Sequence, residues 1–206
     1  MNSLTNTTGK LPKARKILKA AARLFGSNGY RDTAMRDIVM ASEMSKGAIY
    51  HYFPQKEDIL FEVLDWYMDQ VLQGLEAELL PLPAGETRIR HIIRRHIALY
   101  VDNVHAAKTL LHEAGQLPPE KFARIADKQR QYFRIVAKVL QEYADGGVDA
   151  PCLTAITFTL FGMCNWIYSW YHPDMALNPD ELAEIIYKTF TRGVSRTWRR
   201  EADPAV

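Results

Sequence analysis

The sequence has only two cysteines among its 206 residues, Cys152 and Cys164, and both lie in one apolar run. On a helix, side chains twelve positions apart are too distant to form a disulfide bond. The first ten residues, MNSLTNTTGK, also lack the apolar segment that directs a protein to secretion. We therefore expect a reduced, cytoplasmic protein whose fold depends on a buried apolar core.

The sequence also lacks the motifs of common enzyme classes. It has no glycine-rich phosphate loop, no nucleophile elbow and no zinc signature. His91, His96, His105 and His112 suggest a metal site, but His105 and His112, which share a helical face, would lie about 10 Å apart along the axis. Zinc ligands lie roughly 2 Å from the ion, so this spacing is too long for one metal ion and we expect no metal site. Because the motifs above are missing, we also expect no other cofactor and no enzymatic activity.

Acidic residues are scarce at the start of the chain. Up to Tyr52, nine lysines and arginines stand against three acids, a charge of +6. The whole chain carries +2, so the remainder carries −4. A basic segment on an acidic body is typical of a nucleic-acid-binding module, although a solvated basic face would have the same composition.

Helical periodicity and cap residues predict an all-α fold of about nine helices, with no strands. Gly29 ends a first helix, Thr33 and Ser45 are N-cap residues of two short helices, and Pro54 ends the third helix at Phe53. Longer helices are predicted over residues 56–80, 86–114 with a break near 103, 119–143, 151–171, and from 179 onward.

The third predicted helix, within SKGAIYHYF, has two unlike faces. On a helical wheel, Ala48, Ile49 and Tyr52 share the buried side. The opposite side consists of Lys46, Gly47, Tyr50 and His51. Such residues can contact phosphates and base edges, and glycine lets a backbone approach closely. Three short helices with this face on the third predict a helix-turn-helix, whose last helix enters the major groove of DNA.

The segment LFGSNGYRDTAMRDIVMASEMSKGAIYHYFPQKEDIL, residues 24–60, resembles the DNA-binding domain of the TetR (tetracycline repressor)/AcrR family of bacterial regulators. The resemblance implies a helix-turn-helix head over residues 10–55 and a helical ligand-binding and dimerisation domain over 56–200. It also implies a set of DNA-contacting positions, namely Thr33, Ser45, Lys46, Gly47, Tyr50, His51 and Lys56.

The turn before the third helix departs from the family pattern. The family usually has Ala-Gly-Val-Ser, whereas this chain has Ser42-Glu43-Met44-Ser45. Glutamate in a left-handed turn position costs on the order of 1 kcal/mol relative to glycine. We therefore expect a slightly reshaped turn.

Residues 152–171, CLTAITFTLFGMCNWIYSWY, contain no charge and are long enough to span a membrane. The polar residues within the segment and the missing basic flanks favour instead a helix buried between two subunits. The last helix offers a matching face, which consists of Leu182, Ile185, Ile186, Thr189, Phe190 and Gly193. We predict a homodimer through the last two helices and no membrane insertion; a monomeric core is the alternative.

Polar and aromatic residues mixed into apolar helices are typical of small-molecule pockets, although each one alone is more often a core residue. The candidate ligand-binding residues are Tyr67, Met68, Tyr100, Asn103, His112, Tyr132, Asn165, Trp166 and Tyr168. The segment NWIYSWYHP is similar to one in TetR-family members that respond to acyl-CoA thioesters. Ser169 and His172 stand where such relatives often have arginine, so a neutral hydrophobic effector is equally compatible.

Together these patterns predict a ligand-responsive DNA-binding regulator, most simply a repressor released from a palindromic operator by a small hydrophobic effector. Its partners would be double-stranded operator DNA, the effector and a second copy of the chain. The alternatives are a non-specific architectural DNA-binding protein, which the lack of long basic tails disfavours, and an enzyme that carries a basic bundle.

Overall fold

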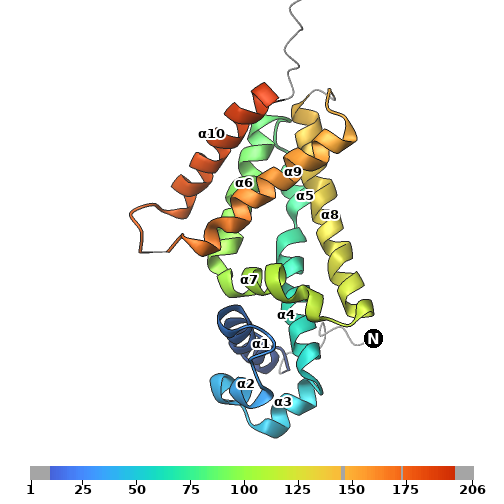
Figure 1. Cartoon of the computed structure of the whole chain (residues 1–206), viewed down its shortest axis with the longest axis vertical. Helices are drawn as coiled ribbons and strands as arrows, with labels where there is room; N and C mark the ends of the chain where they lie inside the picture. Colours follow the sequence, from blue (N-terminus) through green and yellow to red (C-terminus); the bar gives the residue numbers. More distant parts are fainter. Residues whose placement is uncertain (1–9, 145–146, 173, 198–206) are drawn as a thin grey trace, which may run out of the picture. The chain divides into compact units, whose positions relative to one another are not determined.

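The computed structural model describes residues 10–144, 147–172 and 174–197, and these residues form helices and loops without a β-strand. The α-helices are α1 Lys10–Asn28, α2 Met35–Ser42, α3 Lys46–Tyr52, α4 Lys56–Leu72, α5 Leu75–Leu79, α6 Glu86–Asp102, α7 Val104–Glu113, α8 Pro119–Tyr143, α9 Ala150–Asn165 and α10 Pro179–Thr197 (Figure 1). Two short 3-10 helices are η1 Ala114–Gln116 and η2 Trp166–Ser169. The all-α prediction is confirmed, and the predicted domain end at residue 200 lies outside the described residues.

The chain divides into two compact units. The first comprises residues up to Gln70 together with Asn103–Lys128, and therefore holds α1 to α3, most of α4, α7 and the start of α8. The second comprises Val71–Asp102 and the residues from Gln129 onward, and holds α5, α6, most of α8, α9 and α10. This division follows compactness, so the functional boundary near residue 55 stays a prediction.

In the first unit, α1 packs closely against α7 and α2. Ile17, Ala21 and Phe25 form the buried stripe of α1, as the periodicity predicts. A Cβ atom at Gly26 would lie 2.8 Å from the carbonyl oxygen and 2.9 Å from the Cα of His105 on α7. Glycine at position 26 is therefore what allows the two helices to approach this closely.

The start of α2 differs from the prediction that Thr33 is its N-cap. Ala34 occupies the N-cap position, and its N–H donates to the carboxylate of Asp37 at 2.8 Å. The hydroxyl of Thr33 instead donates to the carbonyl oxygen of Gly29 at 2.8 Å. The prediction is wrong because the hydroxyl of Thr33 bonds back to the end of α1 and not forward to α2.

The helix predicted over residues 56–80 is interrupted. α4 ends at Leu72, Gly74 adopts a left-handed conformation with φ of 74°, and α5 follows from Leu75. Glycine takes this conformation at little cost, so the break is built into the sequence. The predicted break near residue 103 is confirmed, because α6 ends at Asp102 and α7 begins at Val104.

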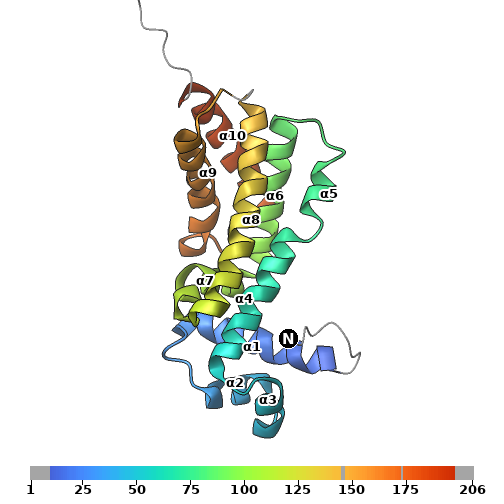
Figure 2. The ribbon, with the colours of Figure 1, turned by 90° about the vertical axis from the view of Figure 1, so that its right-hand side faces the viewer.

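In the second unit, α10 lies along α6, and α9 lies beside both helices (Figures 1 and 2). Arg90 of α6 forms an ion pair with Glu184 of α10, and its guanidinium carbon lies 4.0 Å from the centre of the Tyr187 ring. The hydroxyl of Tyr187 donates to Glu86 at 2.6 Å. These side chains hold the inner face of α10 against α6.

Local capping sets the ends of the last helices. Asp149 accepts a hydrogen bond from the N–H of Cys152 at 2.9 Å, and Asn178 accepts one from the N–H of Glu181 at 2.9 Å. Both helix starts are confirmed. The helix predicted over 151–171 is α-helical only to Asn165 and continues as the 3-10 helix η2 to Ser169.

Candidate nucleic-acid interface and candidate ligand site

Helix α3 presents the predicted polar face to solvent. Ser45, Lys46, Gly47, Tyr50 and His51 are exposed, whereas Ile49 is completely buried. The ammonium group of Lys46 lies 5.8 Å from the centre of the Tyr50 ring, so these two side chains share one patch of surface. The facing predicted from the helical wheel is confirmed, and contact of this face with DNA stays a prediction.

Two residues at the start of α3 have distinct roles. The hydroxyl oxygen of Ser45 accepts a hydrogen bond from the N–H of Ala48 at 3.2 Å and caps the helix, as predicted. A Cβ atom at Gly47 would meet nothing within 4 Å. Packing within the chain therefore does not require glycine at position 47, which leaves the close approach of a partner as a reason for it.

The turn between α2 and α3 has the strained backbone that the sequence predicts. Glu43 adopts φ of 52° and ψ of 31°, the only positive φ outside glycine in the described residues. Its carboxylate lies 2.7 Å from the ammonium group of Lys16 on α1. This hydrogen-bonded contact lowers the pKa of Glu43, but both groups are exposed, so the pair contributes little stability.

The ammonium group of Lys56 is engaged inside the protein. It donates to the carbonyl oxygens of Tyr30 at 2.7 Å and Thr33 at 2.8 Å. Burial lowers the pKa of Lys56, while the nearby charges of Asp32 and Glu113 act in the opposite direction. Lys56 therefore joins the start of α4 to the α1–α2 loop.

Thr33 was expected on the DNA-contacting surface. Its side chain is only 1% exposed, and its hydroxyl is already bonded to Gly29. The Thr33 side chain is therefore not part of the exposed face, and this assignment is corrected. The side chains of Thr33 and Lys56 both donate to carbonyl oxygens of the loop between α1 and α2.

The predicted ligand-binding residues fall into both units. Tyr67 and Met68 on α4 are buried, Asn103 is partly buried, and His112 is exposed; all four belong to the first unit. Trp166 and Tyr168 belong to the second unit, where their rings meet edge to face at 5.6 Å and Trp166 is 61% exposed. The remaining candidates are Tyr100, Tyr132 and Asn165, which the second unit brings around one histidine.

That histidine is His96 of α6, and it forms a polar centre with residues from α8 and α9. Nδ1 of His96 lies 2.9 Å from the hydroxyl oxygen of Tyr132, and Nε2 lies 3.0 Å from Oδ1 of Asn165. The amide oxygen of Asn165 can only accept, so Nε2 carries the proton and Nδ1 accepts from Tyr132. Burial lowers the pKa of His96 to about 4, despite the opposing effect of the Asn165 hydrogen bond, so the ring is neutral at pH 7.

Aromatic rings extend from this polar centre to the surface. Phe161 stacks on Tyr132 at 5.4 Å and on His96 at 6.3 Å. Phe161 also meets Phe158, which pairs with Phe133 at 5.3 Å and is 60% exposed. Neutral hydrogen-bonding groups surrounded by aromatic rings suit an uncharged, partly apolar portion of a ligand.

Sequence reasoning treated His96 only as a metal candidate and missed this arrangement. A usable signal was present, because His96 and Tyr100 are one helical turn apart and share a face of α6. Among the described residues, no group of three or more His, Cys, Asp or Glu side chains could hold a metal ion. Both cysteines are free, and burial raises the pKa of the Cys164 thiol to about 12.

The outer face of α9 carries no charge. Its exposed residues are Pro151, Thr154, Ala155, Phe158, Thr159 and Gly162. By length and composition alone, Ala150–Ser169 could cross a membrane. On α10, Leu182, Ile186 and Phe190 are buried within the chain, whereas Ile185, Thr189 and Gly193 are exposed. The matching face predicted on α10 is therefore corrected, because half of it packs within its own subunit.

Known proteins with similar sequence and structure are bacterial regulators. The HTH-type transcriptional repressor KstR2 of Rhodococcus jostii is 26% identical over 191 residues, which cover 87% of this chain and 89% of the relative. A TetR-family regulator from Bordetella parapertussis superposes with a TM-score of 0.82 at 29% identity, covering 86% of this chain and 93% of that chain.

A third similar structure includes ligands. AibR in complex with isovaleryl coenzyme A and operator DNA has a TM-score of 0.76 at 28% identity, covering 86% of this chain and 97% of that chain. Two family models also match: "Bacterial regulatory proteins, tetR family" over residues 17–63 and "Tetracyclin repressor-like, C-terminal domain" over residues 83–194. The second model alone spans more than half of the chain, and this chain therefore belongs to the TetR family of bacterial transcriptional regulators.

Proposed function

We propose that this regulator is a cytoplasmic homodimeric repressor that binds a palindromic operator through α3 and leaves it when a small effector binds the second unit. The exposed face of α3 carries the proposal. Lys46, Tyr50 and His51 are exposed beside Gly47, where a Cβ atom would meet nothing within 4 Å among the described residues. Proteins use such side chains for phosphates and base edges, and a bare backbone for close approach to DNA.

The residues proposed to contact DNA are Ser45, Lys46, Gly47, Tyr50 and His51, with Lys56 as a supporting residue. Exposed lysines and arginines of α1 add positive charge to the same unit, namely Lys13, Arg15, Lys19 and Arg23. Neutralising phosphates with such residues makes binding steeply dependent on salt. Two recognition helices in one dimer would read half-sites about 34–36 Å apart, or a multiple of that distance.

The proposal that the chain dimerises rests on the uncharged outer face of α9. Phe158 is 60% exposed and Ile185 of α10 is 51% exposed, which is unfavourable in water. Ala155, Thr159 and Gly162 are small enough to let another helix approach. A lipid environment fits less well, because the neighbouring helices α6 and α10 expose the charges of Arg94, Lys188 and Glu181.

For the effector we propose a ligand with a neutral polar group and an apolar part. The polar group would form hydrogen bonds with the polar centre of His96, and the apolar part would contact the rings of Phe133, Phe158 and Phe161. Acyl-CoA thioesters are the first class to test, because the similar regulator AibR is described in complex with isovaleryl coenzyme A. The carbonyl of a thioester could accept from Tyr132 if that hydroxyl rotated away from His96. The contacts of His96 support Tyr100, Tyr132 and Asn165 as ligand candidates. The roles of Tyr67, Met68, Asn103, His112, Trp166 and Tyr168 stay predictions.

The experiment is to measure binding of the full-length protein to a duplex that spans its own promoter, from low to physiological salt. We expect a preference of at least about 1,000-fold over a scrambled duplex, as specific DNA-binding proteins show. The same titration with isovaleryl coenzyme A, and with free coenzyme A as control, tests release. Equal affinity for both duplexes would instead support the architectural alternative.

A further inference from the structure

The turn between α2 and α3 contains a glutamate in a conformation that suits glycine. Glu43 adopts φ of 52° and ψ of 31°, a region that glycine enters at little cost and other residues rarely adopt. Its N–H donates to the carbonyl oxygen of Met40 at 3.3 Å and closes the end of α2. A glycine would make the same backbone contact without the strain, so the glutamate side chain is the feature that needs a reason.

A gain in stability does not explain this side chain. The carboxylate of Glu43 lies 2.7 Å from the ammonium nitrogen of Lys16 on α1, and the two side chains are 79% and 50% exposed. Ion pairs this exposed contribute little, because solvent screens them and two long side chains lose freedom. Backbone strain that the fold does not need is often retained for function. A role outside the fold is therefore the better explanation of Glu43.

The pair of Lys16 and Glu43 lies close to the proposed DNA-binding face. Glu43 comes two residues before Ser45, the N-cap of α3, and three residues before Lys46. Within the first unit, α1 packs against α2 (Figure 1). Other exposed cations of α1 are Lys13, Arg15, Lys19 and Arg23. The carboxylate of Glu43 is thus placed in a part of the unit that is rich in positive charge.

The other two acids before Tyr52 act within the fold. The carboxylate of Asp37 accepts a hydrogen bond from the N–H of Ala34 at 2.8 Å, at the start of α2. Burial lowers the pKa of Lys56, and the charge of Asp32 opposes this effect. Glu43 differs from both, because it binds a surface cation that a DNA phosphate could otherwise attract.

We propose that Glu43 is a positioning residue that holds the ammonium group of Lys16 away from DNA phosphates and thereby limits binding to non-specific sequences. The inference rests on the proposed function, because it assigns a source of specificity to the same DNA-binding unit. Non-specific binding depends almost entirely on phosphate contacts, and such a complex can shift until any available cation meets a phosphate. In the specific complex the base contacts of α3 fix the register, so an available Lys16 would gain less.

The experiment measures the affinity of the full-length protein for the promoter duplex and for a scrambled duplex between about 0.05 and 0.2 M salt. Glu43→Gln removes the charge, keeps the length of the side chain and so releases Lys16. For the scrambled duplex, the slope of log K against log salt should steepen by about 0.9, the effect of one more phosphate contact. This change amounts to about 5-fold in affinity at about 0.15 M salt if both proteins bind alike at about 1 M. For the promoter duplex the affinity should rise by less than about 2-fold.

Variants at both residues separate the pair from a general effect of charge. In a Lys16→Ala background, Glu43→Gln should leave the slope unchanged, because no ammonium group is released. Lys16→Ala alone should change the affinity for the scrambled duplex by less than about 2-fold, since this lysine is already held back. Glu120→Gln is the control for net charge: Glu120 is an exposed acid of the first unit on α8, and its loss should keep the wild-type slope.

Glu43→Gly tests the strain separately. It removes the charge and the strained conformation together, so it should bind DNA like Glu43→Gln and unfold at a higher temperature. An effect on DNA binding in Glu43→Gly but not in Glu43→Gln would assign the role to the shape of the turn and overturn the proposal. An unchanged slope in Glu43→Gln, or equal gains on both duplexes, would overturn it too. A wild type without preference for the promoter duplex would contradict the proposed function, while the slopes on the scrambled duplex would still decide whether Glu43 holds Lys16 back.

Discussion

The ammonium nitrogen of Lys56 lies 2.7 Å from the carbonyl oxygen of Tyr30 and 4.2 Å from the centre of the Tyr30 ring. A lysine that the family resemblance places on a DNA phosphate thus also binds the loop that precedes α2. The two roles have different consequences for salt dependence, because only a phosphate contact releases counterions.

Lys56→Met should lower the free energy of unfolding by about 1–3 kcal/mol, since it leaves two carbonyl oxygens without a charged donor. Any loss of DNA affinity should leave the slope of log K against log salt unchanged. Lys46→Ala should behave in the opposite way, with normal stability and a slope reduced by about 1. A slope reduced equally in both variants would restore Lys56 to the set of phosphate contacts.

Gly26 and Gly47 are both helical, but their surroundings differ. Gly26→Ala places a methyl group against the backbone of His105, so we expect a loss of about 1–3 kcal/mol in stability from overpacking. Gly47→Ala meets nothing in the chain and should raise stability by about 0.5–1 kcal/mol. Its operator affinity should nevertheless fall, and normal affinity would show that DNA does not approach the backbone of α3 closely.

The neutral His96 should make stability depend on pH. Its pKa is about 4 in the folded protein and about 6.5 when unfolded, so between these values the unfolded chain binds more protons. The free energy of unfolding should therefore fall as the pH falls through this window, by about 2 kcal/mol between pH 7 and pH 5.

Urea titrations of wild type and His96→Gln at both pH values isolate this contribution. The comparison is needed because burial and the charges of Lys108 and Arg23 also lower the pKa of His105. We expect the stability difference between wild type and His96→Gln to shrink at pH 5. A difference that is independent of pH would mean that His96 is accessible to water and takes up its proton normally.

Phe158→Glu should prevent dimerisation, because it puts a charge at the centre of the uncharged face of α9. Analytical ultracentrifugation at micromolar concentration should then show a monomer. Phe122→Glu is a suitable control, since Phe122 is also exposed but lies on α8 in the first unit. A dimer that survives Phe158→Glu would move the subunit interface elsewhere.

Local signals predicted much of the fold. The facing of Ile49 and Tyr50 follows from helical periodicity, and the caps at Ser45, Asp149 and Asn178 use partners within three residues. Thr33 was misassigned because its hydroxyl could either accept from an N–H group of α2, as an N-cap does, or donate to a carbonyl oxygen at the end of α1. Sequence alone does not rank these two hydrogen bonds. The choice was settled by the closure of the loop onto Gly29.

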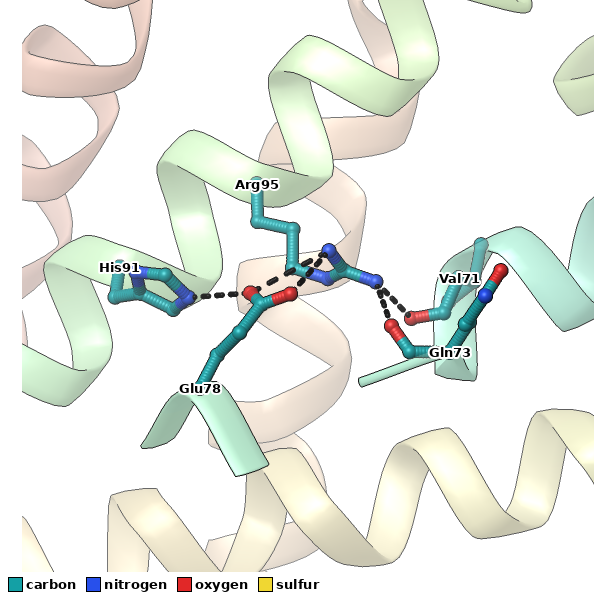
Figure 3. Close-up of polar contacts among 5 residues, drawn as sticks. All are labelled: Val71, Gln73, Glu78, His91 and Arg95. Carbon is teal, nitrogen blue, oxygen red and sulfur yellow. Dashed lines mark hydrogen bonds and ion pairs between the residues drawn. The ribbon is translucent and has the colours of Figure 1, made fainter. Parts of the chain in front are cut away.

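The polar centre of His96 and the contact of Arg95 with the end of α4 (Figure 3) could not be predicted in the same way. His96 finds its partners 36 and 69 positions further along the chain, at Tyr132 and Asn165. The break after Leu72 was missed because the apolar periodicity continues across Gly74, while the arginine that caps the end of α4 comes more than twenty residues later. Contacts of this kind depend on tertiary packing, which a single sequence does not specify.

The contacts that hold α10 against α6 also affect how tightly another subunit could bind. The inner face of α10 is held within the chain by contacts among Arg90, Glu184, Tyr187 and Glu86. The rotation of α10 about its own axis is therefore fixed. Ile185 and Thr189 are therefore presented in one orientation before any partner arrives. Association on this face would lose little conformational entropy, and a modest contact area could suffice for a stable pair.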